Sequence, residues 1–321
     1  MNGKKNKLFL QALGYGFAGL DVIKFNKEEF FLPGGTCANV MSALASLGWH
    51  TTIIKSAYSD TWNNYIDSVW RKMGVIVNNC HKSKRPTPRV VQEFIGPEHF
   101  FYTTCPKCKT MLLNLSLPPT KTIKENLDNI NYDFLFYDRM SDGIRYLLSI
   151  FNSLKKWTFY EPNSAYSYNT FVNNVAECDI VKFSDKRIPL SVSAKLLPDL
   201  KKIKAKTKIV IITHGCMGMS YSIFRNGSYL EYIFLPVKSF MNVVDSSGAG
   251  DWVSAGFINN FINIYPTVTD ELDEDAVKSA LSMGHTQAEQ CCSSIGAIGR
   301  LIKNIRINVP NDVSKCQYCK I

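Results

Sequence analysis

The feature that most constrains the fold is an alternation of short apolar runs with longer stretches of helical spacing. The apolar runs are rich in β-branched and aromatic residues and occupy residues 51–57, 132–137, 157–160, 179–183 and 208–213. Strands that alternate with helices connect through βαβ units and form a mostly parallel sheet covered on both faces. With 321 residues, 45% of them hydrophobic, we expect an α/β fold: a three-layer αβα sandwich in a single domain over residues 1–321.

One helix is especially clear. After Asp60, large apolar residues repeat at spacings of three and four up to Met73. This pattern predicts an amphipathic helix with Asp60 as its N-cap and the aromatic stripe in the core. The stripe consists of Trp62, Tyr65, Ile66, Val69, Trp70 and Met73.

Two segments interrupt the alternation. Residues 89–95 and 99–102 flank a Gly96-Pro97 turn, which is typical of a β-hairpin, and residues 22–31 supply further strand-like sequence. We expect these segments, about 22–33 and 87–104, to form a small β-sheet lid inserted in the domain.

A loop of small residues, 245–250, runs directly into a predicted amphipathic helix and is followed by Asp251. Small residues before a helix N-terminus expose backbone N–H groups at the positive end of the helix dipole, which favours phosphate binding. A carboxylate beside that loop can accept a proton, so the pattern favours phosphoryl transfer to a hydroxyl. The alternative is a tight turn before a core helix.

Near the N-terminus, Gly34 and Gly35 precede a helix whose apolar residues keep helical spacing until Gly48 stops it. The paired glycines allow a ligand to approach the backbone closely. Asn39 lies in the first turn, where its amide can hydrogen-bond a polyol.

Together, these two motifs resemble the signatures of the PfkB/ribokinase-like carbohydrate kinase family. Gly34 to Asn39 is similar to the GGxxxN signature, and Asp245 to Asp251 is similar to DTxGAGD, with Ser246 in place of Thr. The resemblance implies a ribokinase-like or fructokinase-like enzyme that moves the γ-phosphoryl group of Mg-ATP to an alcohol group of a sugar. It implies Asp251 as catalytic base, Gly248, Ala249 and Gly250 as anion hole, and Asp21, Gly34, Gly35 and Asn39 as substrate-binding residues.

For Asp21 the alternative is a turn residue between strands. The run 208–213 breaks into a glycine turn that resembles the family's nucleotide-binding TxGxxG segment. The resemblance implies that ATP contacts Lys182, Ser184, Thr213, Gly215 and Gly218, and that His214 lies beside the nucleotide without acting as a base.

The magnesium region departs from the family pattern. Glu161-Pro162-Asn163 resembles the family's DPN-like turn, but Ser184 and Arg187 replace both defining residues of its NxxE segment. The resemblance places Glu161, Asn163 and Asp185 near the metal and the phosphates. Either Asp185 supplies the missing carboxylate, or ATP and water hold Mg²⁺, or Asp185 belongs to a solvated charge cluster. A monovalent cation is also compatible with the resemblance.

Among 10 cysteines, two pairs have the spacing that lets two thiolates bind one metal ion: Cys105 with Cys108, and Cys316 with Cys319. We interpret them as a structural zinc site that anchors the C-terminal tail, residues 309–321. Free thiols and redox pairs are the alternatives. The other cysteines are expected to be small core residues.

The formal charge is +10, but no nucleic-acid motif accompanies it, so we expect ATP and a small-molecule substrate rather than nucleic acid. Arg85 and Arg89 keep a phosphorylated sugar in consideration. Lys4 to Lys7 before residues 8–20 imitates a signal peptide without a convincing cleavage site, and no run is long enough to span a membrane. We expect a cytoplasmic protein, with a homodimer through the lid as one outcome.

Three functions remain open from the sequence. The first is a sugar kinase, and the second is a nucleoside kinase of the same fold. The third is a catalytically weak, ligand-binding relative, suggested by the altered NxxE segment.

Overall fold

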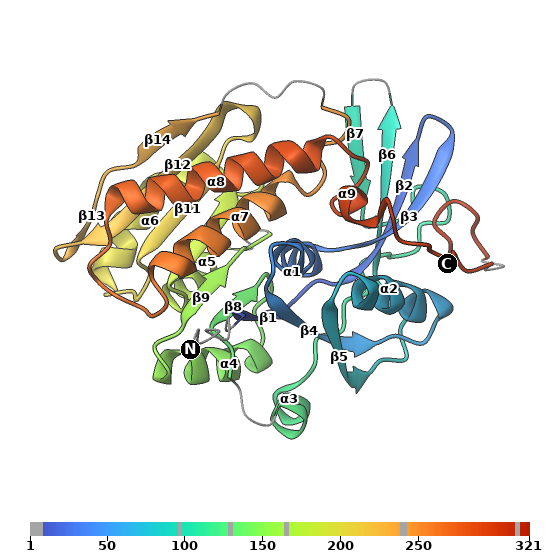
Figure 1. Cartoon of the computed structure of the whole chain (residues 1–321), viewed down its shortest axis with the longest axis horizontal. Helices are drawn as coiled ribbons and strands as arrows, with labels where there is room; N and C mark the ends of the chain where they lie inside the picture. Colours follow the sequence, from blue (N-terminus) through green and yellow to red (C-terminus); the bar gives the residue numbers. More distant parts are fainter. Residues whose placement is uncertain (1–8, 96–97, 128–130, 164–166, 238–242, 312–314) are drawn as a thin grey trace, which may run out of the picture.

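The computed structural model describes residues 9–95, 98–127, 131–163, 167–237, 243–311 and 315–321. A large central sheet lies between two layers of helices, and a second, smaller sheet stands beside it (Figure 1). This arrangement confirms the predicted α/β sandwich with a mostly parallel sheet and an additional small sheet.

The central sheet is 10-stranded, in the order β13-β12-β11-β10-β9-β8-β1-β4-β5, with β14 also paired to β12. All neighbours from β11 to β5 are parallel, whereas β12 pairs antiparallel with β11, β13 and β14. The strands are β1 (Gln11–Tyr15), β4 (His50–Ala57), β5 (Val75–Lys82), β8 (Phe134–Tyr137), β9 (Trp157–Tyr160), β10 (Ile180–Ser184), β11 (Ile209–Thr213), β12 (Gly218–Arg225), β13 (Ser228–Tyr229) and β14 (Ile233–Pro236).

The helices form two separate hydrophobic cores, one on each face of this sheet. One face carries α1 (Thr36–Ser46), α2 (Thr61–Lys72), α7 (Ala249–Ile264) and α8 (Glu274–Cys292). The other carries α3 (Thr120–Asn126), α4 (Asp142–Ser153), α5 (Tyr168–Ala176) and α6 (Leu190–Lys202). A 3₁₀ turn (Gly215–Met217) and the short α9 (Gly299–Ile302) complete the described helices.

The prediction for α2 is confirmed. The Asp60 side chain accepts a hydrogen bond from the backbone N–H of Asn63, and the aromatic stripe is buried up to Trp70, with Met73 half-buried at the end.

Helix α7 is more deeply buried than the amphipathic helix expected from its sequence. It packs against both α1 and α8, and its residues from Asp251 to Ile258 are all buried. The contact with α8 is close, because a Cβ atom on Gly284 would lie 2.6 Å from the carbonyl oxygen of Val253. The start of α7 is therefore held rigidly against its neighbours.

The small sheet has the order β3-β2-β6-β7 and consists of β2 (Gly19–Phe25), β3 (Glu28–Gly34), β6 (Arg89–Ile95) and β7 (Glu98–Tyr102). Strands β6 and β7 pair antiparallel, as expected for the hairpin, although its Gly96-Pro97 turn lies outside the described residues. Ile23 and Leu32 of this sheet pack against Ile298, just before α9. Within the described segments, no helix combines the length and apolar character needed to cross a membrane.

Candidate active site

Acidic residues gather where the parallel strands of the central sheet end. Asp138 follows β8, Glu161 follows β9, and Asp185 follows β10. The carboxyl ends of parallel strands are where α/β folds bind ligands, because the loops there converge at one edge. This edge is therefore the candidate active site.

The loop before α7 is held by Asp245. One carboxylate oxygen of Asp245 accepts a hydrogen bond from the N–H of Ser247 at 2.7 Å, and the other accepts from the N–H of Gly296 at 2.7 Å. Gly248 then takes a left-handed conformation with φ +76°, and a Cβ atom there would lie 2.2 Å from Cβ of Ala297. Only glycine fits this position without strain.

Asp251 lies in the first turn of α7 and is 8% exposed. Its Oδ2 atom accepts a hydrogen bond from Nδ2 of Asn39 at 2.7 Å, so the two sequence motifs meet in space. Burial and then the nearby charge of Glu161 raise the pKa of Asp251 to about 7, while the bond from Asn39 opposes this shift. The Oδ1 atom of Asn39 is buried without a hydrogen-bond partner among the described residues, which leaves an acceptor for a ligand hydroxyl.

Asp21 points from β2 toward the glycine pair at the start of α1. A Cβ atom on Gly34 would lie 2.2 Å from Oδ2 of Asp21, and one on Gly35, where φ is +102°, would lie 2.5 Å from the carbonyl oxygen of Phe17. Burial raises the pKa of Asp21 to about 7, with contributions from the charges of Asp251 and Asp245. The structure thus brings the predicted substrate residues to one place beside the predicted base.

Lys182 and Glu161 form a buried ion pair, with 2.6 Å between Nζ and Oε1. Ser254 of α7 donates a hydrogen bond to the other carboxylate oxygen of Glu161 at 2.8 Å. A Cβ atom on Gly250 would lie 3.5 Å from Nζ of Lys182, so this cation sits next to the small-residue loop. Asn163 follows Glu161 closely and is half-buried.

The predicted nucleotide residues lie on β10, β11 and the turn that follows. Ser184 and Thr213 are register partners in these parallel strands. The turn contains Gly215 and Gly218, with φ of +60° and +132°.

His214 in that turn is engaged on both ring nitrogens. Nδ1 lies 2.7 Å from Oδ2 of Asp185, and Nε2 lies 2.8 Å from Oγ of Ser220. Asp185 is therefore committed to a histidine, which leaves less of its carboxylate for a metal ion.

Sequence reasoning missed two parts of this edge. Asp138 is buried, and its Oδ1 accepts a hydrogen bond from the N–H of Phe17 at 2.8 Å. Burial raises the pKa of Asp138, while the positive charges of Arg139 and Arg187 act in the opposite direction. Arg187 also lowers the pKa of Asp251, so it lies within electrostatic reach of the predicted base. The signal for Asp138 was available, because it follows an apolar strand just as Glu161 does.

Arg89 is wrong as a phosphate-binding candidate. Its side chain is 1% exposed, and Nη2 lies 2.8 Å from Oδ2 of Asp60, the N-cap of α2. Desolvation would leave this guanidinium unstable without its partner, so its role is structural. Arg85 donates a hydrogen bond to the carbonyl oxygen of Leu115 at 3.3 Å.

The structure brings together Cys105, Cys108, Cys316 and Cys319, whose sulfur atoms all lie within 4.8 Å of one another. Of the remaining cysteines, Cys37, Cys178, Cys291 and Cys292 are buried as expected. Cys80 is half-buried, and Cys216 is exposed in the 3₁₀ turn, so the core expectation is wrong for Cys216.

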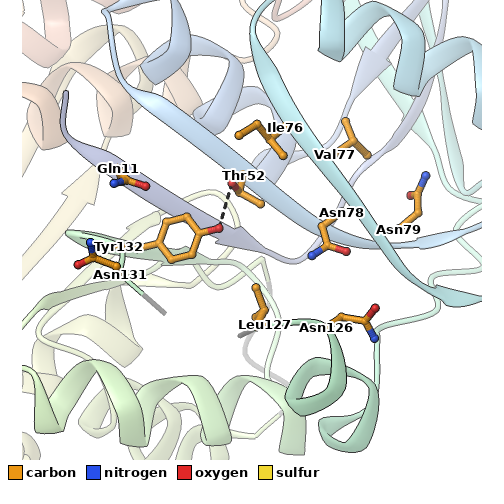
Figure 2. Close-up of a pocket in the computed structure, with 10 residues that line it drawn as sticks. All are labelled: Gln11, Thr52, Ile76, Val77, Asn78, Asn79, Asn126, Leu127, Asn131 and Tyr132. Atoms are coloured by element: carbon orange, nitrogen blue, oxygen red, sulfur yellow. Dashed lines mark hydrogen bonds between the residues drawn. The ribbon is translucent and has the colours of Figure 1, made fainter. Parts of the chain in front are cut away.

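A separate hollow of about 490 Å³ opens near the amino ends of β1 and β8, away from the acidic edge (Figure 2). Figure 2 shows the Tyr132 hydroxyl donating a hydrogen bond to Thr52, at 3.1 Å. The described residues that line it have amide, hydroxyl and aliphatic side chains, and none of them apart from that phenol is ionisable. These described side chains do not offer the carboxylates that gather at the acidic edge.

Part of the chain matches the model of a known protein family. The model of the pfkB family carbohydrate kinases matches residues 150–304, which include Glu161 and Asp251. This matched region, a little under half of the chain, is therefore similar to the PfkB family. No curated protein matches this chain significantly.

Solved structures show the same fold at low sequence identity. Ribokinase from Giardia lamblia aligns with a TM-score of 0.70 and 14% identity, over 90% of this chain and 94% of that one. Fructokinase from Vibrio cholerae O395, bound to fructose, ADP and a potassium ion, aligns with a TM-score of 0.66 and 14% identity. The alignment covers 90% of this chain and 94% of that one. Adenosine kinase from Sinorhizobium meliloti aligns with a TM-score of 0.68 and 16% identity, over 90% of this chain and 95% of that one. The chain thus shares the fold of these three kinases over nearly its whole length.

Proposed function

We propose that this protein is an ATP-dependent kinase that transfers the γ-phosphoryl group of Mg-ATP to an alcohol group of a sugar. One observation carries the proposal: the carboxylate of Asp251, with a pKa raised to about 7, lies at the start of α7 and binds Asn39. A base with a pKa near neutrality is suited to accepting a proton at physiological pH.

In this proposal Asp21 and Asn39 orient the acceptor hydroxyl, and Asp251 accepts its proton. The backbone of Gly248, Ala249 and Gly250, at the positive end of α7, faces the negative charge that develops on the transferred group. Lys182, next to Gly250, adds a positive charge to the same region.

The residues present fit a nucleotide with its metal held mostly by phosphate and water. Both carboxylate oxygens of Glu161 have protein partners, and Asp185 is bound to His214. Mg²⁺ keeps several water ligands in most protein sites, so Glu161, Asn163 and Asp185 would hold it through water. Bound Mg-ATP supplies the phosphoryl group, and Ser184, Thr213, Gly215 and Gly218 would line the nucleotide. A structural neighbour contains potassium, and we extend the proposal to a monovalent cation.

The small sheet would act as the lid of this site. Asp21 lies on β2 of that sheet, and Gln92 of β6 accepts a hydrogen bond from Ser247 at 2.9 Å. A cover over the acceptor excludes water and limits ATP hydrolysis. Strands β3 and β7 form the edges of the sheet, and a homodimer through it stays a prediction.

The deciding experiment is a coupled ADP-release assay over sugars, phosphosugars and nucleosides, with wild type and Asp251→Asn in parallel. The proposal expects turnover with a sugar and its loss in the variant. Turnover confined to nucleosides would replace the sugar with a nucleoside, as the kinship with adenosine kinase structures allows. Ligand binding without turnover, equal in both proteins, would indicate the ligand-binding relative.

A further inference from the structure

Four cysteines from distant parts of the chain converge at the base of the small sheet. Cys105 and Cys108 lie in the loop after β7, whereas Cys316 and Cys319 belong to the C-terminal tail. The sulfur atoms of Cys105 and Cys316 are 4.0 Å apart, and those of Cys108 and Cys319 are 3.7 Å apart.

These separations fit a shared metal ion better than disulfides. A disulfide would place two sulfur atoms about 2.05 Å apart. A tetrahedral zinc ion with Zn–S bonds of about 2.3 Å places its four sulfur ligands about 3.8 Å from one another. The sulfur pairs at 3.7 and 4.0 Å lie close to that value.

The two cysteine pairs also have the same backbone turn. The N–H of Lys109 donates to the carbonyl oxygen of Cys105 at 3.0 Å, and the N–H of Lys320 donates to that of Cys316 at 2.8 Å. Both lysines have left-handed backbones, with φ of +62° and +57°. A non-glycine residue in this region costs free energy. The left-handed residue occurs at the same place in both pairs, which indicates that a common interaction stabilises both turns.

The surroundings provide positive charge for a thiolate site. Four thiolates and one zinc ion together carry two excess negative charges. The buried guanidinium of Arg89 donates hydrogen bonds to the carbonyl oxygens of Cys319, at 3.3 Å, and Lys320. Lys107, Lys109 and Lys320 lie within or next to the two pairs. Such outer partners stabilise metal ligands and fix their orientation.

We propose that Cys105, Cys108, Cys316 and Cys319 bind one structural Zn²⁺ ion, which fastens the C-terminal tail to the base of the small sheet. Binding replaces thiol protons with metal–sulfur bonds, releases the protons to solvent and oxidises nothing. The tail also touches the sheet directly. Tyr318 donates a hydrogen bond to Glu93 of β6 at 2.7 Å, and Lys320 pairs with Glu29 of β3 at 3.2 Å. The site is separate from the proposed kinase chemistry.

The first test is metal analysis of the full-length protein purified under reducing conditions without added metal. We expect about one zinc per chain, as in other four-cysteine sites. The variants Cys108→Ser and Cys319→Ser should lose most of it, and the exposed Cys216→Ser should keep it as a matched control. Iron in place of zinc, no bound metal, or unchanged zinc in both variants would overturn the proposal.

A second measurement covers the case in which the serine variants fail to fold. Wild-type protein is exchanged with Co²⁺, and its visible spectrum is recorded. Intense absorption typical of tetrahedral cobalt bound to thiolates, which disappears when stoichiometric Zn²⁺ is added, supports the site. Weak absorption typical of octahedral cobalt overturns it. Kinase activity enters neither measurement, so the zinc proposal and the proposed function can fail separately.

Discussion

At the scale of single residues, the proposed chemistry depends on Asp251. Replacing it with Asn keeps the size of the side chain but removes the proton acceptor. We expect kcat/KM to fall about 10²–10⁴-fold, the usual contribution of a general base. Steady-state kinetics measures the loss, and binding of an ATP analogue by the same variant controls for intact folding. Activity within threefold of wild type would rule out this residue as the base.

The pH dependence of the reaction follows from the same carboxylate. Because burial raises the pKa of Asp251 to about 7, kcat/KM should rise as the pH increases through 7 and level off above it. Asn39→Ala removes the hydrogen bond that favours the charged form, so the rise should move to higher pH. Profiles of both proteins between pH 5.5 and about pH 9 test this, and coincident profiles would contradict it.

The raised pKa of Asp21 predicts how the free energy of unfolding depends on pH. Its folded-state pKa is raised from 3.8 to about 7, so the folded protein binds the proton more tightly than the unfolded chain. The contribution of this group to the free energy of unfolding is fully present below about pH 4 and is lost as the pH rises through about 7. Asp21→Asn removes the cost of a buried charge and should raise the melting temperature relative to wild type at pH 8 more than at pH 5. Calorimetry at both pH values measures the difference, and Asp142→Asn on the surface of α4 serves as control.

The sequence predicted the members of the candidate site better than their partners. Asn39 and Asp251 stand in recognisable motifs, and the structure joins them by a hydrogen bond. The ion pair between Lys182 and Glu161 could not be predicted, because it depends on how two strands lie side by side. Arg89 was misjudged for the same reason: its charge suggests a surface residue, and only the tertiary structure shows it buried against Asp60.

At the scale of elements, the junction between the small-residue loop and α7 carries a paired test. Gly248→Ala would strain a left-handed residue and collide with Ala297, so it should cost about 1–3 kcal/mol of unfolding free energy. Gly250→Ala meets only Lys182, at an ordinary contact distance of 3.5 Å, and should unfold like wild type. Chemical denaturation compares the two variants, and equal destabilisation would contradict the geometry.

Helices and strands were predicted where local signals were strong, as for α2 with its Asp60 cap. The deep burial of α7 was not predicted, because it results from packing against α1 and α8, which lie elsewhere in the chain. The close approach at Gly284 has no local signature either, since an isolated glycine in a helix reads only as a weak point.

At the scale of the whole molecule, the proposed acceptor and nucleotide residues come from two sheets. Ligands that bind only the folded state stabilise it, by about 2.7 kcal/mol at a concentration 100 times Kd. A correct sugar together with a non-hydrolysable ATP analogue should therefore raise the melting temperature by several degrees, and a non-substrate sugar should not. A fluorescence-based melting assay measures the shift, and no shift for any sugar that supports turnover would contradict the assigned site.

Gly296 lies between the loop before α7 and the small sheet. Its N–H holds Asp245 and so the loop before α7, while a Cβ atom there would lie 2.5 Å from Leu32 of the small sheet. The same backbone unit thus contacts both the loop and the small sheet, and we expect a movement of one to affect the other. We therefore expect sugar and nucleotide binding to be synergistic: each ligand should raise the affinity of the protein for the other by the same factor. In the proposed kinase, this coupling would limit ATP hydrolysis when no acceptor is bound.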